Sequence, residues 1–340
     1  MTAAPPAADP SSRTASGWIE ATGYVFVIGA LSLVYAIGHR FGAHPMAFVL
    51  YAVVMSSIAM LAATGVGNDT LAIARHPMSW LVGASIILVE VFYYLTISYV
   101  PPAHGNLIPR FAIPMAMITG WALFGRRPAP IAIAATVAVT AASSYVVAIT
   151  DPAVRWHAAG AGLLCSAFLV VRGFAGEFHP WNRAAVTARE KLRVTGTLLL
   201  VTSILSLVLA SILAGAVAAG ALPPMRILPT AGEMLHLPTI LIGTFAGGGF
   251  LALLNILQFS AVVKITTENI TAMMAISPLT TWLFQEIGVA LGLIDVARPE
   301  SRLVAAMAVI VLSVLVIVFA GRRPAAVTGN RAASPRRPGP

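Results

Sequence analysis

The sequence contains a series of long runs in which nearly every residue is apolar. A bilayer core about 30 Å thick is crossed by about 20 helical residues. Backbone polar groups in lipid must be paired within a helix or a closed barrel, and these runs are continuous rather than alternating, which favours helices. We therefore expect an all-α membrane protein. About ten transmembrane helices are predicted, at residues 19–38, 46–66, 78–99, 103–125, 130–149, 156–175, 194–219, 237–262, 266–293 and 302–321.

The scarcity of charge supports this prediction. Of the 340 residues, 58% are hydrophobic and only 10% are charged, whereas a soluble domain carries about 25% charged residues. The mean hydropathy is +0.87. The net charge of +9 comes from basic residues scattered between apolar runs, so no nucleic-acid partner is predicted. The single cysteine and the spacing of the histidines predict neither a metal site nor a cofactor.

The two ends of the chain differ in composition from the rest. Residues 1–17 are rich in Ala, Pro and Ser, and residues 322–340 mix Arg, Pro, Ala and Ser, so we predict a disordered tail at each end. Between them we expect a first five-helix repeat at 18–150 and a second at 151–321. Arginine outnumbers lysine nineteen to two, a usage that is typical of a GC-rich bacterial genome.

The distribution of basic residues predicts the orientation. An even number of spans places both termini on one side, where fifteen Lys and Arg residues fall, against five on the other. Because cytoplasmic loops collect basic residues, we predict a multi-pass protein of the cell inner membrane with both termini in the cytoplasm. Arg172, at the end of the span 156–175, is expected to extend its side chain to the interface. Arg110 is left inside a span.

The two halves of the chain resemble each other. HRFGAHPM at 39–46 and FAGEFHPW at 174–181 each follow the first helix of a half. LTISYVPPAHGNLIPRFAIP at 95–114 and LQFSAVVKITTENITAMMAISP at 257–278 share a span end, a polar turn with Asn and a later proline, with a gap of two residues. A duplicated unit with an odd number of helices inverts in the membrane, as in many secondary carriers. We therefore expect two inverted five-helix repeats.

The connection between the predicted third and fourth spans carries a family resemblance. It reads SYVPPAHGNLIPRFAIPMAMITGWALFG, and its counterpart in the second half reads SAVVKITTENITAMMAISPLTTWLFQEIG. With these segments, residues 19–321 resemble the drug/metabolite transporter superfamily, specifically the ten-helix EamA-type permeases. In that family the fourth and ninth helices follow tight turns, carry a mid-helix proline and end near an acidic residue.

Individual positions match this family pattern in part. Pro114 and Pro278 match the two prolines, and Glu286 matches the acidic residue of the second half. The first half has Arg126 and Arg127 instead, which departs from the pattern. The resemblance implies a central cavity that is lined mainly by helices 1, 3, 4, 6, 8 and 9 and opens alternately to each side.

Charged residues inside the first-half spans are the main site candidates. A charge at mid-membrane costs about 2.5–3.5 kcal/mol on insertion scales and needs a partner or a wet cavity. Glu90 and Arg110 lie at comparable depths on either side of a tight turn, so we predict an ion pair, either structural or opened by substrate or proton. Asn106, four residues before Arg110, and Tyr94, four after Glu90, extend this polar stripe. Tyr94 alternatively packs at a helix contact.

Polar residues of the second half supply further candidates for substrate binding or coupling. Asn255 and Gln258 are three residues apart in the predicted eighth span, while Glu268 and Asn269 open the ninth. Glu268 alternatively complements the helix dipole, with Lys264 as its surface partner.

The motifs present and missing favour a transporter over an enzyme. The sequence has no GxxxxGK[ST] motif for ATP-driven pumping and no hydrolase motif such as HExxH. We predict a secondary transporter that moves a small polar or amphipathic, amino-acid-like metabolite across the bilayer by alternating access, with export favoured by the resemblance alone. Arg110 suits a carboxylate, and Glu90 is the candidate proton-coupling group. The alternatives are a membrane-embedded transferase acting on a lipid-linked or small substrate, and a structural subunit.

Overall fold

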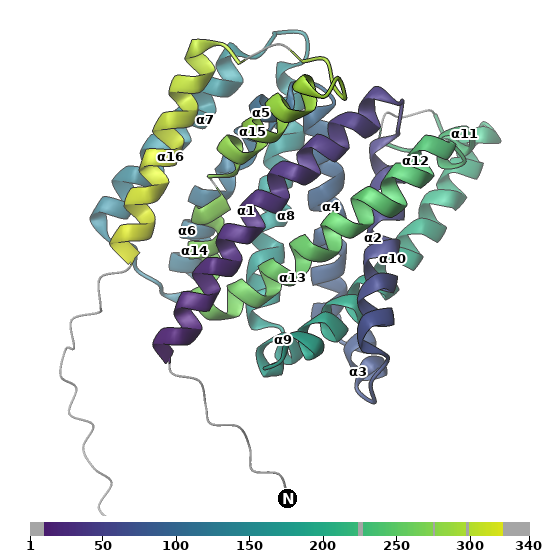
Figure 1. Cartoon of the computed structure of the whole chain (residues 1–340), viewed down its shortest axis with the longest axis horizontal. Helices are drawn as coiled ribbons and strands as arrows, with labels where there is room; N and C mark the ends of the chain where they lie inside the picture. Colours follow the sequence, from purple (N-terminus) through teal and green to yellow (C-terminus); the bar gives the residue numbers. More distant parts are fainter. Residues whose placement is uncertain (1–9, 224–226, 275, 297–298, 322–340) are drawn as a thin grey trace, which may run out of the picture.

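The computed structural model describes residues 10–223, 227–274, 276–296 and 299–321, which form a bundle of helices with no strand (Figure 1). The first half contains α1 (Pro10–Arg40), α2 (Pro45–Thr64), α3 (Thr70–Arg75), α4 (Pro77–Ile97), α5 (Pro102–Gly105), the short helix η1 (Ile108–Phe111), α6 (Ala112–Phe124) and α7 (Pro130–Ile149). The second half contains α8 (Arg155–Phe178), α9 (Pro180–Ala184), α10 (Ala188–Ala218), α11 (Ala231–Met234), α12 (Leu237–Leu241), the π-helical turn η2 (Ile242–Gly247), α13 (Gly248–Ile265), α14 (Thr267–Met274), α15 (Ser277–Ala290) and α16 (Ser301–Gly321).

Eight of the described helical segments are long and apolar enough to cross a bilayer. They are residues 14–40, 45–64, 77–97, 102–124, 130–149, 155–178, 188–218 and 237–265. The predicted span 266–293 is divided into α14 and α15, and the predicted span 302–321 lies within α16. The structure is thus an all-α, multi-pass membrane protein.

The ends of the chain and the fourth span depart from the sequence prediction. Residues 10–17, expected in a disordered tail, form the first turns of α1, while 1–9 and 322–340 lie outside the described residues. The predicted single helix 103–125 is α5, η1 and α6 in succession. Pro102 and Pro109 lie at the starts of the first two, because proline is tolerated in a first helical turn but breaks a helix interior.

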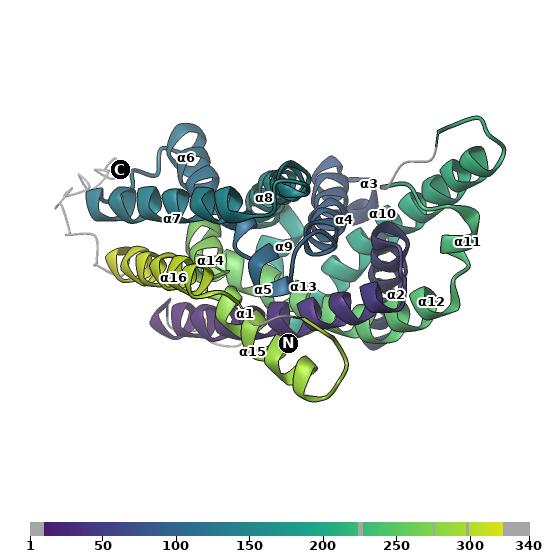
Figure 2. The same ribbon diagram turned by 90° about the horizontal axis from the view of Figure 1, so that it is seen from above.

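The helices pack in pairs that each join the two halves. α1 packs along α13, and α4 packs along α8. Two further pairs flank these, α2 with α10 and α7 with α16 (Figures 1 and 2). The core of the bundle is therefore built between the halves rather than within either one.

A further contact between the halves, that of α2 with η2 and the start of α13, depends on glycines that lack side chains. Gly247 and Gly248, at the junction of η2 and α13, face α2, where an added Cβ on Gly247 would lie 2.9 Å from the Phe48 ring and 3.0 Å from Ala52. Small residues at such positions let two helix backbones approach closely. This contact keeps α13 against α2 and fixes the position of the polar residues on α13.

The bundle has two ends that would face the two sides of a membrane. We call the end at which α1 begins the N-terminal face, and the other end the opposite face. The N-terminal face carries the start of α1 together with α3, α9 and the start of α14, and α16 also ends there (Figure 1). The opposite face carries α5, α11 and the connection from α15 to α16. Charged residues are distributed very differently over these two faces.

Candidate functional site

A small cavity of about 40 Å³ lies in the middle of the bundle, where six segments meet. α1, α4, η1, α8, α13 and α14 each contribute lining residues. Three of these residues are charged, and all three are almost fully buried: Glu90 is 3% exposed, Arg110 4% and Arg172 1%. The remaining lining residues are Tyr24, Ile28, Leu31, Val89, Tyr93, Pro109, Cys165, Leu169, Leu254 and Met274.

Glu90 is held by partners from two other helices. Its Oε1 accepts from Arg172 Nη1 at 3.3 Å, and its Oε2 accepts from the Tyr35 hydroxyl at 2.8 Å. Arg172 also donates from Nη2 to Asn255 Oδ1 at 2.9 Å, while its Nε has no hydrogen-bond partner among the described residues. The contact between Glu90 and Arg172 is longer than the 2.7–2.9 Å typical of charge-assisted bonds. The pair is therefore loose and incompletely satisfied.

Arg110 is bound entirely by neutral acceptors. Its Nε donates to the Asn106 carbonyl at 2.8 Å, and Nη2 donates to Ser277 Oγ at 3.1 Å and to the Asn106 side-chain oxygen. Nη1 donates to the carbonyl of Met274, the last residue of α14. A cation at a helix C-terminus interacts favourably with the helix dipole. Arg110 thus links η1 of the first half to the break between α14 and α15.

The predicted ion pair between Glu90 and Arg110 is wrong, because Glu90 pairs with Arg172. The prediction placed Glu90 and Arg110 at similar depths, and both do line one cavity. However, the neighbour of α4 in this region is α8. The expectation that Arg172 reaches the interface is also wrong, because α8 continues to Phe178 and keeps Arg172 in the core.

The other first-half candidates surround these charges. Asn106 is fully buried and donates from Nδ2 to the Tyr93 hydroxyl at 3.0 Å and to Thr281 Oγ1 at 2.6 Å. Tyr94 faces away from the cavity: its ring stacks on Tyr35 at 4.8 Å between centroids, and its hydroxyl donates to the Ala43 carbonyl at 3.4 Å. Tyr94 therefore has the packing role that was the alternative, behind the Tyr35 ring that holds Glu90.

The four second-half candidates lie in four different places. Asn255 joins the central cluster through Arg172, whereas Gln258 is buried one turn further along α13 with its Oε1 unpartnered among the described residues. Asn269 donates to the Ile265 carbonyl at 2.7 Å and closes the short connection between α13 and α14. Glu268 lies at the N-terminal face in an ion pair. Sequence reasoning missed Tyr35 and Arg172, although a charge within an apolar run was a usable signal for the latter.

Glu268 belongs to a charged cluster that joins the halves at the N-terminal face. Arg126, in the α6–α7 connection, donates to Glu268 at 2.8 Å and forms a second ion pair with Glu177 at the end of α8. Glu177 Oε2 also accepts from Thr267, at 3.0 Å from the backbone N and 2.6 Å from Oγ1. The Arg126 guanidinium lies over the rings of Phe124, Phe174 and Phe178 at 5.4–5.8 Å, an arrangement that adds cation–π attraction.

Two more ion pairs join the halves at the same face. Lys264 Nζ lies 2.5 Å from Glu20 Oε1, and Arg193 Nη2 lies 3.2 Å from Asp69 Oδ2. Lys264 was expected beside Glu268, and that expectation is wrong. These four ion pairs and Glu90–Arg172 each connect the first half to the second, and the four lie at the N-terminal face.

A buried histidine completes this face. His179 caps α9: its Nδ1 accepts from the Asn182 backbone N–H at 3.3 Å, so Nε2 carries the proton and donates to Ser79 Oγ at 2.9 Å. Ser79 belongs to α4, so this contact also crosses between the halves. Burial, with a smaller contribution from His76, lowers the pKa of His179 to about 4. The imidazole is therefore neutral at physiological pH.

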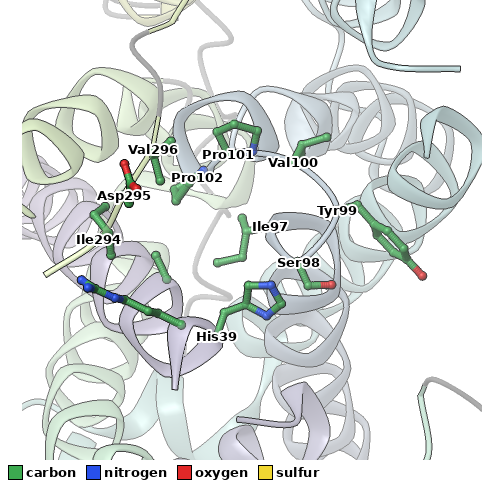
Figure 3. Close-up of a pocket in the computed structure, with 12 residues that line it drawn as sticks. His39, Ile97, Ser98, Tyr99, Val100, Pro101, Pro102, Ile294, Asp295 and Val296 are labelled. Atoms are coloured by element: carbon green, nitrogen blue, oxygen red, sulfur yellow. The ribbon is translucent and has the colours of Figure 1, made fainter. Parts of the chain in front are cut away.

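The opposite face contains two pockets. A pocket of about 480 Å³ lies between the ends of α1 and α4 and the segment after α15, lined by His39, Tyr99 and Asp295 among others (Figure 3). A second pocket of about 380 Å³ shares Tyr99 and is lined also by His104 and Glu300.

Hydrogen bonds also join the halves at the opposite face. Arg40 Nη1, at the end of α1, donates to the Gly292 carbonyl at 2.6 Å, and the Tyr51 hydroxyl of α2 donates to the Met234 carbonyl at 2.7 Å.

Comparisons with known proteins define the fold but not the activity. No family model and no curated protein matches the chain. A solved structure described only as "Crystal structure of protein" is similar with a TM-score of 0.56 and 21% sequence identity, covering 92% of this chain and 99% of that one. At this identity the likeness shows a shared fold over nearly the full length of both chains.

Proposed function

We propose that this protein is a secondary transporter that moves a small polar or amphipathic metabolite through the centre of the bundle. The observation that carries the proposal is the buried cluster of Glu90, Arg110 and Arg172 around a cavity at the junction of the two halves. Ionisable residues inside a membrane protein are costly and mark substrate or ion pathways. A purely structural subunit has no need of three such residues around a cavity.

The contrast between the two faces supports alternating access. At the N-terminal face, ion pairs between the halves close the route to the centre, whereas the opposite face has a large pocket. A central cavity of about 40 Å³ is too small for a metabolite, so the solute enters only when one face opens. Movement of one half against the other would break the ion pairs and close the pocket. It would thereby convert the form that is closed at the N-terminal face into one that is closed at the opposite face.

The helix contacts support two inverted five-helix repeats and ten crossings, with α14–α15 and α16 as the last two. If α8, α10, α13 and α16 correspond to α1, α2, α4 and α7, then the contact of α1 with α13 has its counterpart in that of α8 with α4. The pairs α2–α10 and α7–α16 join corresponding helices. This is the pattern of a two-fold axis between repeats.

Family, orientation and direction follow from the same proposal. The cavity is lined by the six spans that the resemblance to EamA-type permeases implies, which supports membership of the drug/metabolite transporter superfamily. The basic residues favour a cytoplasmic N-terminal face, in an inner membrane of a bacterial cell. The solute then enters the pocket of the opposite face, or leaves by it in the export direction that the family resemblance favours. Glu90 is the proposed proton-coupling residue.

Flux from proteoliposomes tests the transport proposal. Vesicles loaded with an equimolar panel of amino acids and organic acids are compared with protein-free vesicles, and the solutes that leave are identified by mass spectrometry. We expect selective loss of some solutes through the wild-type protein, and at least a tenfold slower loss through Glu90→Gln, Arg110→Ala and Arg172→Gln. Arg302→Gln, which removes an exposed charge on α16, is the matched control and retains wild-type flux.

The same experiment separates the carrier from the alternatives. Wild-type flux in all three central variants contradicts the proposed site. A solute recovered outside only as a covalently altered product favours the membrane-embedded transferase. The observed polar cluster lies in the bundle centre rather than at one face, which is the reason we favour the carrier.

A further inference from the structure

We infer that the central cavity binds the carboxylate of a small organic anion that carries no ammonium group. This inference rests on the proposed transport function and narrows its substrate class. The cavity lining contains two cationic side chains, Arg110 and Arg172, but a single carboxylate, that of Glu90. The other lining residues carry no formal charge at neutral pH, so the buried site holds one excess positive charge.

The excess charge belongs to Arg110. Its acceptors are two oxygens of Asn106, the Met274 carbonyl and the Ser277 hydroxyl, all of them neutral. No carboxylate of the described residues forms an ion pair with it. A buried charge without a counter-charge is unfavourable, and a bound anion removes that cost. A cationic or neutral solute does not.

Arg172 offers a second point of attachment. Its Nε is a buried donor without a partner among the described residues, and its single contact with Glu90 is long at 3.3 Å. A guanidinium binds carboxylates best through two parallel N–H donors. A solute carboxylate between Arg110 and Arg172 therefore satisfies a donor that Glu90 leaves unused. Glu90 keeps its hydrogen bond from the Tyr35 hydroxyl in this arrangement.

The charge balance also argues against a zwitterion. A bound anion brings the cluster of two arginines, one glutamate and one carboxylate to neutrality. An amino acid adds no net charge, so the site keeps its excess of one, and Glu90 is the only lining carboxylate that could accept the ammonium group. The rest of the lining, which includes Ile28, Leu31, Val89, Leu169 and Leu254, suits an apolar body.

A matched six-carbon series tests the inference by binding alone. Purified protein in detergent is titrated with hexanoate, hexanamide, 2-aminohexanoate and hexylamine, and binding is followed by the shift in melting temperature. We expect hexanoate to bind at least ten times more tightly than each of the others. Phenylacetate, phenylacetamide and phenylalanine form a second series with the same expected order.

Variants assign the binding to the named residues. Glu90→Gln, which keeps a hydrogen-bonding side chain and raises the excess charge, is expected to bind hexanoate about fivefold or more tightly. Arg110→Gln and Arg172→Gln are expected to weaken hexanoate binding at least tenfold if they fold. Arg302→Gln, which removes an exposed charge on α16 outside the cavity, is the matched control and leaves the dissociation constant unchanged.

The outcomes distinguish this inference from the transport proposal. Tightest binding of 2-aminohexanoate, with loss on Glu90→Gln, overturns the inference but leaves a transporter of amino acids. An equal response to hexanoate and hexanamide in both series overturns it as well. Conversely, selective binding of hexanoate by a protein that moves no solute supports the anion site and contradicts the transport function.

Discussion

The two faces of the bundle differ in how the halves are joined. At the N-terminal face, Arg126, Lys264 and Arg193 each pair with a carboxylate of the other half. At the opposite face the ends of α1 and α4 border a pocket of about 480 Å³. Movement of the halves thus breaks ion pairs at the N-terminal face, whereas at the opposite face it breaks hydrogen bonds such as that from Arg40 Nη1 to the Gly292 carbonyl. We therefore expect the ion pairs to stabilise a form that is closed at the N-terminal face, and we expect each pair to contribute more the more deeply it is buried.

A single reporter position measures opening of that face. Thr271 lies between Glu268 and Met274 on α14, three residues from each, so it shares a helix face with both the ion pair and the cavity. It is 3% exposed. In a Cys165→Ser background, a cysteine introduced by Thr271→Cys reacts with a membrane-impermeant maleimide only when the N-terminal face opens. Inside-out vesicles present the predicted cytoplasmic face to the reagent.

Removal of Arg126 is expected to have the largest effect. Its two carboxylate partners are mostly buried, with side-chain exposures of 11% for Glu177 and 24% for Glu268, and both would lose their counter-charge. We expect Arg126→Gln to disfavour the closed form by about 2–3 kcal/mol, between the values for exposed and buried pairs. Labelling at position 271 then accelerates about 30-fold or more. Unchanged labelling contradicts the view that this contact closes the face.

The second largest effect is expected from pH, because the stability of the closed form depends on the protonation of His179. Its pKa of about 4 in the closed structure lies below the ordinary value of about 6.5. The closed form is therefore most stable relative to the open form above about pH 6.5, where His179 is neutral. This stability is lost as the pH falls from 6.5 toward 4. At pH 5 we expect a loss of about 1–2 kcal/mol and labelling accelerated about tenfold.

His179→Asn supplies the control for this pH dependence. Asparagine keeps an N-cap acceptor for α9 but does not titrate. The ratio of labelling rates between the parent protein and this variant cancels the effect of pH on thiol reactivity itself. A ratio that stays constant from pH 7.5 to pH 5 contradicts the assigned role of His179.

The pair Lys264–Glu20 is expected to rank third. The side chains of Lys264 and Glu20 are 14% and 22% exposed. Each of the two charges has one ion-pair partner, whereas Arg126 has two. A double-mutant cycle with Lys264→Met and Glu20→Gln should give a coupling energy of about 0.5–1 kcal/mol, or a two- to fivefold change in labelling. Raising the salt to 0.5 M should reduce this coupling, because screening acts on partly exposed pairs. A coupling energy as large as the Arg126 effect would reverse the proposed ranking by burial.

Sequence reasoning located the membrane segments better than the contacts between them. Hydropathy fixes the depth of a residue, and Glu90 and Arg110 were correctly placed in the interior. It carries no information on lateral order, so α8 was not recognised as the neighbour of α4, and Arg172 was missed as the partner of Glu90. The end of α8 at Phe178 rather than 175 moved Arg172 deeper by about one turn.

The ion pairs of the N-terminal face also could not be predicted from the sequence. Arg126 and Glu268 were each visible as charges at predicted helix ends, but they are 142 residues apart in the chain. Lys264 was assigned to Glu268 because it lies four residues away, a spacing that favours a contact within one helix. The single residue Thr266 between α13 and α14, with φ of +70°, interrupts that helix. Lys264 instead reaches Glu20 on α1, a contact between halves that local spacing cannot predict.

The pair Arg193–Asp69 is expected to have the smallest effect. Its side chains are 28% and 33% exposed, and the N–O distance of 3.2 Å is the longest of the peripheral ion pairs. Water solvates both charges when the pair separates, so Asp69→Asn should change labelling at position 271 less than twofold, about 0.4 kcal/mol or less. Asp295→Asn, at the pocket of the opposite face, provides the matched control and should leave the rate unchanged. If Asp69→Asn instead opens the face as strongly as Arg126→Gln, the number of ion pairs between the halves, rather than their burial, sets the stability of the closed form.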